Sequence, residues 1–212
     1  MIQIFILGSS SVYGVGGKSG WADPLKQVFH DKMYRENGVG EKYEVYNFGK
    51  SGATIDFVRQ TFPQQLQNYR RGGKIITIFN VGGNNAKAEG KPDNFVSTIE
   101  EYTEEMSELL DMLKAKSNYL IAVGGGFYDE AKTNPKPNPL TGGQSFFTNK
   151  RKQEFQDRFK KLCEERGITF VDVGVDGEEW KEKYLYEDGL HPNQKGHELI
   201  CKNVLVEVEK LL

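Results

Sequence analysis

The chain alternates short apolar runs of strand length with longer segments in which apolar residues recur every three or four positions. The apolar runs predict five strands, at Ile2–Leu7, Tyr43–Asn47, Lys74–Phe79, Tyr119–Val123 and Ile168–Val173. The helical period predicts helices at Trp21–Asn37, Ile55–Tyr69, Asn149–Arg166 and Gln194–Leu211. One further helix has a clear apolar face made of Ile99, Tyr102, Met106, Leu109, Leu110 and Leu113. We expect Asp93 or Asn94 to cap it.

This alternation of strands and helices predicts an α/β fold. Strands that alternate with helices form a parallel sheet with helices on both of its faces. A length of 212 residues is suited to a single domain, here residues 1–212. Ligands of such sheets bind beyond the carboxyl ends of the strands, so functional residues are expected just after each predicted strand.

Composition and charge narrow the class of protein. Apolar residues make up 37% of the chain and charged residues 27%, which is typical of a globular protein and not of a disordered or membrane-spanning one. The net charge is −2 with both signs interspersed, so we expect no nucleic-acid partner and no stable membrane insertion. The first apolar run has about six residues and no basic flank, so we interpret it as a strand and not as a signal peptide.

Two cysteines, Cys163 and Cys201, lie in predicted helices. We expect both to be buried thiols without a disulfide, in keeping with a cytoplasmic protein. No group of residues has the spacing of metal ligands, so no metal or other cofactor is expected.

The segment after the first strand is GSSSVYGVGGKSG, from Gly8 to Gly20. A phosphate-binding P-loop would need glycine at Val12, and a dinucleotide-binding fingerprint would need it at Ser19, so neither motif is complete. A nucleophilic serine on this turn would be exposed at the edge of the sheet, where the backbone N–H groups of a following helix can stabilise an oxyanion. A glycine-rich turn without chemistry is the alternative.

Hydrogen-bond donors follow the next two strands. The sequence NFGKSGAT runs from Asn47 to Thr54, and NVGGNNA runs from Asn80 to Ala86. Glycines let the backbone approach a ligand, and a side-chain amide can donate to developing negative charge. Each segment taken alone is equally consistent with an ordinary turn.

The sequence DGLHPNQKGH near the C-terminus places Asp188 three residues before His191. A carboxylate at this spacing can accept from the imidazole Nδ1–H, which leaves Nε2 free to act as a base. A loop histidine beside a capping carboxylate is the alternative. Because all four segments belong at one edge of one sheet, a serine, two donor groups and an acid–base pair are expected to meet there.

The four segments, in this order, resemble the motif blocks of the SGNH hydrolases, the GDSL-like family of lipases and esterases. The resemblance implies that Ser10 is the nucleophile and that Asp188 and His191 are its acid–base partners. It also implies an oxyanion hole made of the N–H groups of Ser10 and Gly52 and the amide of Asn84. The implied architecture is a three-layer α/β/α sandwich with a five-stranded, flavodoxin-like sheet.

The sequence departs from the family pattern at two positions. Ser9 replaces the aspartate of the name-giving motif, and Asn85 replaces the aspartate after the asparagine. Three adjacent serines also make the nucleophile depend on the register of the motif, so Ser9 and Ser11 remain alternatives to Ser10.

The resemblance implies a serine esterase that acts on a small-molecule ester, with short-chain acyl or acetyl esters expected first. An acylated sugar, a short-chain ester or a lysolipid fits this class. The alternatives are a lysophospholipase or thioesterase of the same family, a non-catalytic binding module that keeps the fold, and a nucleotide-binding protein. The Gly- and Pro-rich stretch Gly124–Gly143 is expected to be either a mobile loop beside the site or a plain surface loop.

Overall fold

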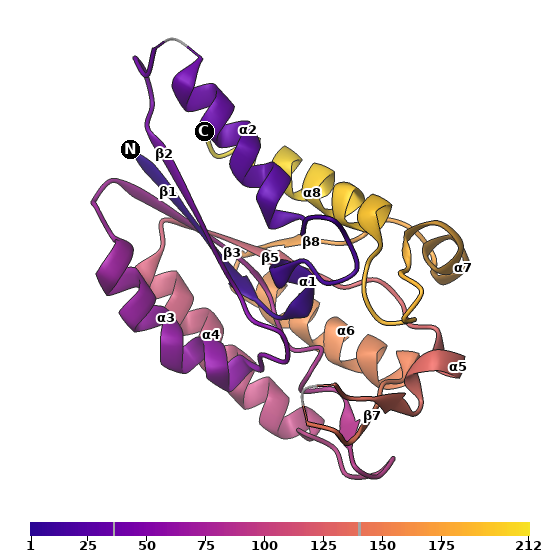
Figure 1. Ribbon diagram of the computed structural model, residues 1–212. Coiled ribbons are helices and arrows are strands. Elements are labelled where there is room, and N and C mark those ends of the chain that lie inside the picture. The colour runs from indigo at the N-terminus through magenta and orange to yellow at the C-terminus, as the bar shows by residue number, and fades with distance from the viewer. Residues whose placement is uncertain (36, 140) are drawn as a thin grey trace.

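Five parallel strands form the central sheet of the computed structural model, which describes residues 1–35, 37–139 and 141–212 (Figure 1). Their order is β2–β1–β3–β5–β8, the order of flavodoxin-like sheets, and confirms the predicted fold class. The strands span Ile2–Gly8 (β1), Tyr43–Gly49 (β2), Lys74–Asn80 (β3), Tyr119–Val123 (β5) and Thr169–Val171 (β8). Strand β5 has the predicted bounds, whereas β8 is shorter than the predicted Ile168–Val173.

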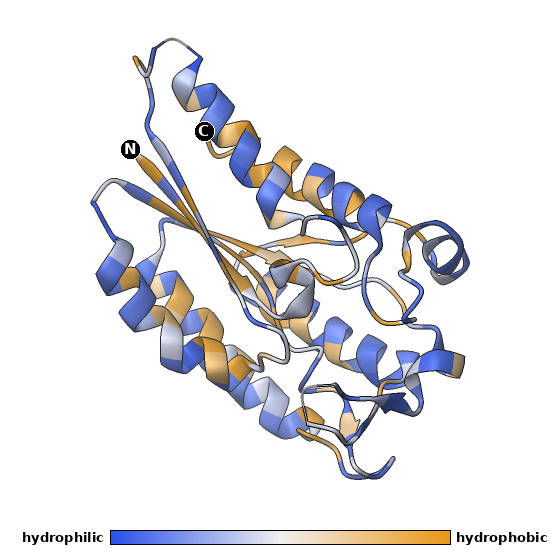
Figure 2. Cartoon of the chain, viewed as in Figure 1, coloured by the Kyte–Doolittle hydropathy of each residue, from blue (hydrophilic) through white to orange (hydrophobic). Residues whose placement is uncertain are grey.

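Helices cover both faces of the sheet (Figure 1). One face carries α2 (Ala22–Tyr34) and α8 (Gln194–Glu209), and the other carries α3 (Ile55–Tyr69), α4 (Ile99–Lys116) and α6 (Asn149–Glu165). The predicted helix 21–37 ends early, and Glu36 within it lies outside the described residues. Figure 2 shows that the apolar sides of these helices face the sheet.

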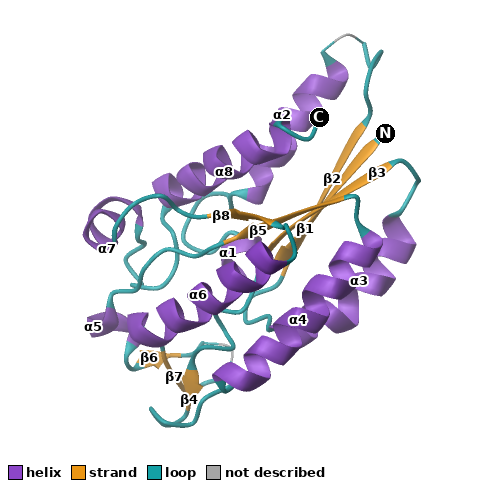
Figure 3. Ribbon diagram, turned by 180° about the vertical axis from the view of Figure 1, so that it is seen from behind, coloured by secondary structure: helices purple, strands orange, loops and turns teal. Residues whose placement is uncertain are grey.

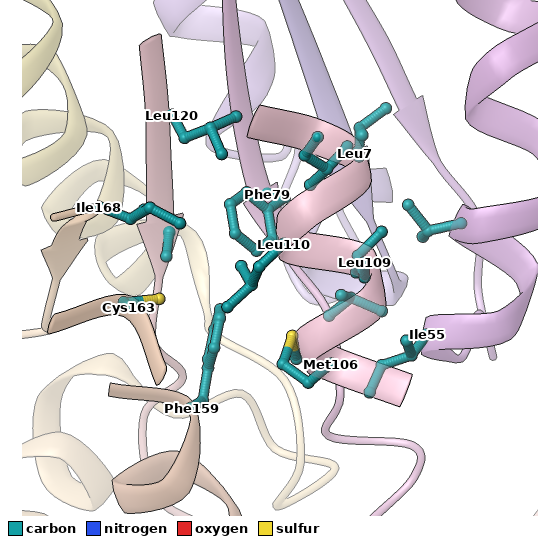
Figure 4. Close-up of a cluster of buried hydrophobic side chains, with 14 of the residues drawn as sticks. Leu7, Ile55, Phe79, Met106, Leu109, Leu110, Leu120, Phe159, Cys163 and Ile168 are labelled. Atoms are coloured by element: carbon teal, nitrogen blue, oxygen red, sulfur yellow. The ribbon is translucent and has the colours of Figure 1, made fainter. Parts of the chain in front are cut away.

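Strand β1 explains why two cores form. Successive side chains of a strand point to opposite faces. Ile2, Ile4 and Ile6 therefore join the cluster with α2 and α8, whereas Phe5 and Leu7 join the cluster on the other face. Figure 4 shows this second cluster, in which Leu7 and Phe79 of the sheet lie with Met106, Leu109 and Leu110 of α4.

The carboxyl ends of the central strands lie level with one another. Gly8, the last residue of β1, is paired with Gly49 on one side and Asn80 on the other. A Cβ at Gly8 would collide with the backbone oxygen of Asn80, so only glycine allows the chain to turn there. The Asn80 amide donates to the backbone oxygen of Val123 at 2.7 Å, which joins the ends of β3 and β5.

A small antiparallel sheet, which the sequence analysis did not predict, lies beyond this edge (Figure 3). It consists of β4 (Ala88–Glu89), β7 (Gln144–Phe146) and β6 (Lys136–Pro137). The stretch Gly124–Gly143 therefore contains α5 (Glu130–Thr133) and β6, while Leu140 within it lies outside the described residues. Elements of two to four residues are too short to show a period in sequence.

The cap of α4 differs from the prediction. Thr98 precedes the helix and accepts from the backbone N–H of Glu101, whose carboxylate accepts from the backbone N–H of Thr98. The cap is therefore Thr98, and the expectation of Asp93 or Asn94 was wrong. The Thr-x-x-Glu pattern of this capping box can be recognised in the sequence.

Two further observations concern the cysteines and the helices. Cys163 and Cys201 are buried free thiols, as expected. Among the described helices, none combines the length and apolar character needed to cross a bilayer.

Candidate active site

Ser10 begins the four-residue helix α1 (Ser10–Tyr13), directly after β1. Its Oγ lies 2.8 Å from Nε2 of His191, a residue 181 positions further along the chain. Ser9 and Ser11 line the same cavity, but in the described part of the chain neither is hydrogen-bonded to His191. Of the three adjacent serines, the geometry thus favours Ser10 as the residue paired with the imidazole.

Asp188 holds the other side of the imidazole. Its Oδ2 lies 2.6 Å from Nδ1 of His191. Its Oδ1 accepts from the backbone N–H groups of Leu190 and His191, at 2.9 and 3.1 Å. One carboxylate oxygen thus shapes the turn while the other binds the ring, so Nδ1 donates and Nε2 is left to accept from Ser10.

The charge of Asp188 is fixed by its surroundings. Burial alone would favour the neutral acid, but hydrogen bonds from the His191 ring and from two backbone N–H groups outweigh burial. They hold the pKa of Asp188 well below its usual range. Asp188 is therefore ionised at neutral pH and can stabilise an imidazolium.

Lys136 of the small sheet contacts the Asp188 carboxylate. The sequence analysis did not predict this contact. Its Nζ donates to the backbone oxygen of Asp188 at 2.7 Å and lies 3.5 Å from Oδ2. The two residues are 52 positions apart, and no sequence motif links them. Only the fold of the small sheet brings them together.

Ser10, Asn84 and His191 line one cavity of about 110 Å³. The Asn84 side chain donates to the backbone oxygen of Ala53 at 3.0 Å, so its amide is held at this edge of the sheet. Gly52, next to Ala53, has φ +79°, is exposed, and is not among the described residues that line the cavity. Within the described chain, the backbone N–H groups of Ser10 and Gly52 have no acceptor.

Asn85, the residue after Asn84, is buried, and its side chain is hydrogen-bonded to three other residues. Its Oδ1 accepts from the backbone N–H of Ile55 at 3.1 Å. Its Nδ2 donates to Ser97 Oγ at 3.1 Å and to Glu105 Oε2 at 3.3 Å. An aspartate could not donate these two bonds, which accounts for an asparagine at this position.

The wall of the cavity comes largely from residues that the sequence analysis did not single out. The residues after β5 include Gly124–Gly126, so this part of the Gly- and Pro-rich stretch lies beside the site. Helix α6 adds Lys152 and Gln156. The aromatic residues of the wall are Tyr102, Tyr128, Phe147, Phe155, Phe159 and Trp180.

The other groups that could carry chemistry lie elsewhere. His197 is buried, and its Nε2 donates to the backbone oxygen of Val15 at 2.9 Å, which holds the segment after α1. Within residues 1–35, 37–139 and 141–212, no three His, Cys, Asp or Glu side chains gather as a metal site would require.

Comparisons with known proteins identify a family and several solved structures that resemble this chain. A sequence model of the GDSL-like Lipase/Acylhydrolase family matches residues 6–199. No curated relative matches the sequence. A lipase/acylhydrolase from Enterococcus faecalis is 16% identical, with a TM-score of 0.74, over 100% of this chain and 97% of that one.

Two further solved structures share the fold. A member of the lipolytic G-D-S-L family from Veillonella parvula DSM 2008 is 13% identical, with a TM-score of 0.70, over 100% of both chains. An acetylxylan esterase from Geobacillus stearothermophilus is 18% identical, with a TM-score of 0.66, over 98% of this chain and 93% of that one.

Proposed function

The chain belongs to the GDSL-like lipase/acylhydrolase family, and on that premise we propose that it is a serine esterase that hydrolyses short-chain or acetyl esters. The observation that carries the proposal is the continuous hydrogen-bonded series Ser10 Oγ, His191 and Asp188, with distances of 2.8 and 2.6 Å. A nucleophile, a base and a residue that orients the base are the parts that acyl transfer through a serine requires.

In the proposed reaction, His191 Nε2 accepts the hydroxyl proton as Ser10 Oγ attacks the ester carbonyl carbon. The tetrahedral intermediate collapses when the bond to the alcohol oxygen breaks and His191 returns the proton to that oxygen. Water then attacks the acyl-enzyme with His191 as base, and the carboxylic acid leaves as Ser10 regains its proton. Asp188 stabilises the imidazolium during both halves.

The oxyanion of each intermediate needs donors. We assign this role to the backbone N–H groups of Ser10 and Gly52 and to the amide of Asn84. The support is that both backbone groups lack an acceptor in the described chain and that Asn84 lies in the cavity with Ser10. Losing one such donor typically lowers kcat by about 10²–10³-fold.

The size of the cavity supports a small acyl group. Its volume of about 110 Å³ lies below the roughly 300–1,000 Å³ of pockets that hold drug-sized ligands. A lysophospholipase or thioesterase would have to place a long chain outside this space. Hydrolysis rates of p-nitrophenyl esters from acetyl to octanoyl would separate these alternatives, with acetyl to butyryl expected to react fastest.

The assignment is tested with three single variants, Ser9→Ala, Ser10→Ala and Ser11→Ala. We expect Ser10→Ala to lose at least about 10³-fold in turnover of p-nitrophenyl acetate and all labelling by a fluorophosphonate. Ser9→Ala and Ser11→Ala should remain labelled. Labelling that survives in Ser10→Ala would move the nucleophile, and absence of labelling in the native protein would favour a non-catalytic binding module.

A further inference from the structure

Lys152 brings an amine that can carry a positive charge to the cavity of Ser10 and His191. It lies in the first turn of α6 and lines the cavity together with both residues. Its Nζ donates to the backbone oxygen of Gly125 at 2.9 Å and lies 5.0 Å and 5.2 Å from the ring centres of Phe127 and Tyr128. One backbone oxygen and two aromatic rings therefore hold the ammonium group in place.

In the described part of the chain, this amine is not paired with a carboxylate. Among the described residues, no Asp or Glu oxygen lies within 4.0 Å of Lys152 Nζ. Burial lowers the pKa of Lys152 to about 7, and the more distant Asp172 only partly opposes this effect. Without a counter-ion the buried amine thus loses part of its charge at neutral pH, and a ligand that carries a negative charge would favour the charged form.

Three other polar side chains of the cavity wall can also donate hydrogen bonds. Gln156 Oε1 accepts from the backbone N–H of Gly125 at 2.9 Å, which leaves its amide N–H groups without an acceptor in the described chain. The hydroxyl groups of Tyr102 and Tyr128 likewise have no acceptor in the described residues. A Cβ at Gly82 would lie 2.9 Å from the Tyr102 hydroxyl, and one at Gly83 would lie 3.5 Å from that of Tyr128.

Both phenols stay protonated, because burial raises the pKa of Tyr102 and of Tyr128. The residues that line the cavity together with the proposed nucleophile thus include an amine, an amide and two hydroxyl groups that can donate. Such a set of donors is complementary to a group rich in oxygen lone pairs that carries a negative charge.

We infer that Lys152 binds a carboxylate carried by the substrate close to the ester bond that Ser10 attacks. The inference rests on the proposed esterase activity and names its substrate class, an ester that also bears a free carboxylate. A single cation balances a single carboxylate, and a cavity of about 110 Å³ has room for a group of that size. The carboxylate belongs either to the acyl group or to the alcohol, and the experiment distinguishes the two.

The test uses two matched pairs of small esters. Monoethyl succinate has its carboxylate on the acyl side, and ethyl succinamate is its neutral amide. Acetoxyacetate has the carboxylate on the alcohol side, and acetoxyacetamide is its neutral amide. We expect the native protein to favour the acid over the amide in kcat/KM by about 10-fold or more in one pair, which identifies the side that carries the charge.

Two variants assign that preference to Lys152. Lys152→Met keeps the length of the side chain without its charge, and the preference for the acid should fall to about one. Lys150→Met removes an exposed lysine from the same helix and should keep both the preference and the rates of the native protein. Absence of a preference in both pairs, or a preference that survives in Lys152→Met, overturns the inference.

A binding measurement separates this inference from the proposed function. In Ser10→Ala no acyl-enzyme can form, so each ester can be tested as a ligand by its effect on the Tm. We expect an acid ester to raise the Tm more than its amide, and this difference to vanish in the double variant Ser10→Ala, Lys152→Met. If the native protein hydrolyses none of the four esters and resists fluorophosphonate, the proposed function fails, and the Tm difference still decides whether Lys152 binds the carboxylate.

Discussion

Lys136 Nζ lies 2.7 Å from the backbone oxygen of Asp188 and 3.5 Å from its Oδ2, so the small antiparallel sheet holds the residue that orients His191. The chain between β5 and α6 provides β6 and β7, two of the three strands of this sheet, and also lines the cavity. This segment therefore both contacts the proposed acid–base pair and forms part of the cavity that Ser10 lines.

Lys136→Met should weaken the proposed reaction by loosening Asp188 and by removing the charge beside it, because Lys136 touches Asp188 and is not among the described residues that line the cavity. Losing this hydrogen bond is expected to cost about 0.5–1.5 kcal/mol, or about 2- to 12-fold in kcat, with little change in KM. Steady-state kinetics on p-nitrophenyl acetate measure both values. Lys132→Met is the matched control, since Lys132 pairs with Asp129 and not with Asp188. An equal loss in both variants would refute a specific role for Lys136.

Asn85→Asp should destabilise the fold, although aspartate is the residue that the family pattern has there. The carboxylate would lose two donated hydrogen bonds and would face Glu105, whose Oε2 accepts from Asn85 at 3.3 Å. We expect a loss of about 1–3 kcal/mol in the free energy of unfolding. Urea denaturation measures it, and a value unchanged from the native protein would contradict this account of Asn85.

The pH dependence of that loss has a definite sign. Burial, with help from the nearby Asp56, already raises the pKa of Glu105, and a second carboxylate would raise it further. A carboxyl group whose pKa is raised in the native state binds protons more tightly there than in the unfolded chain, so stability increases as pH falls. The deficit of Asn85→Asp should therefore be smaller at pH 5 than at pH 8. The double variant Asn85→Asp, Glu105→Gln should regain much of the stability, because the glutamine amide can donate to the new carboxylate.

The sequence was sufficient for the main sheet and for the order of the site residues, because long periodic segments and the strand ends that follow them are local features. Helix α3 has the predicted bounds Ile55–Tyr69, and Ser10, Asn84 and His191 come together as parallel strands require. Lys136 and Lys152 could not be found in this way. Their positions depend on contacts between segments far apart in the chain, and neither residue belongs to a local motif.

Gly126→Ala should disturb the cavity, because a Cβ at this position would collide with the indole ring of Trp180, which is fully buried. Forcing an extra carbon into such a contact typically costs about 1–3 kcal/mol. Gly125→Ala is the matched control, since its Cβ would meet only the flexible end of Lys152, at 3.4 Å. Thermal unfolding should show a lower Tm for Gly126→Ala and nearly the native Tm for Gly125→Ala. Equal Tm values would argue against close packing of Gly126 on Trp180.

The preference for an acid ester should depend on pH if Lys152 binds its carboxylate. Burial lowers the pKa of Lys152 to about 7, so in the free protein the amine is charged below this pH and neutral above it. The substrate carboxylate stays ionised throughout, since its own pKa lies below about 5. The acid-over-amide ratio of kcat/KM, which reports the free enzyme, should therefore be largest near pH 6 and should decline with a midpoint near pH 7.

The acid-over-amide ratio of kcat/KM separates the effect of Lys152 from the effects of the other groups around the site. His191 and Asp188 act on both esters of a pair in the same way, so their contribution to the rate cancels in the ratio. Asp172, which favours the charged amine, and the Tyr128 ring, over which the amine lies, face Lys152 from the neighbouring segments. Tyr128 remains neutral because burial raises its pKa. In Lys152→Met the ratio should be flat from pH 6 to pH 9, and a flat ratio in the native protein would show that the charge on Lys152 does not select the substrate.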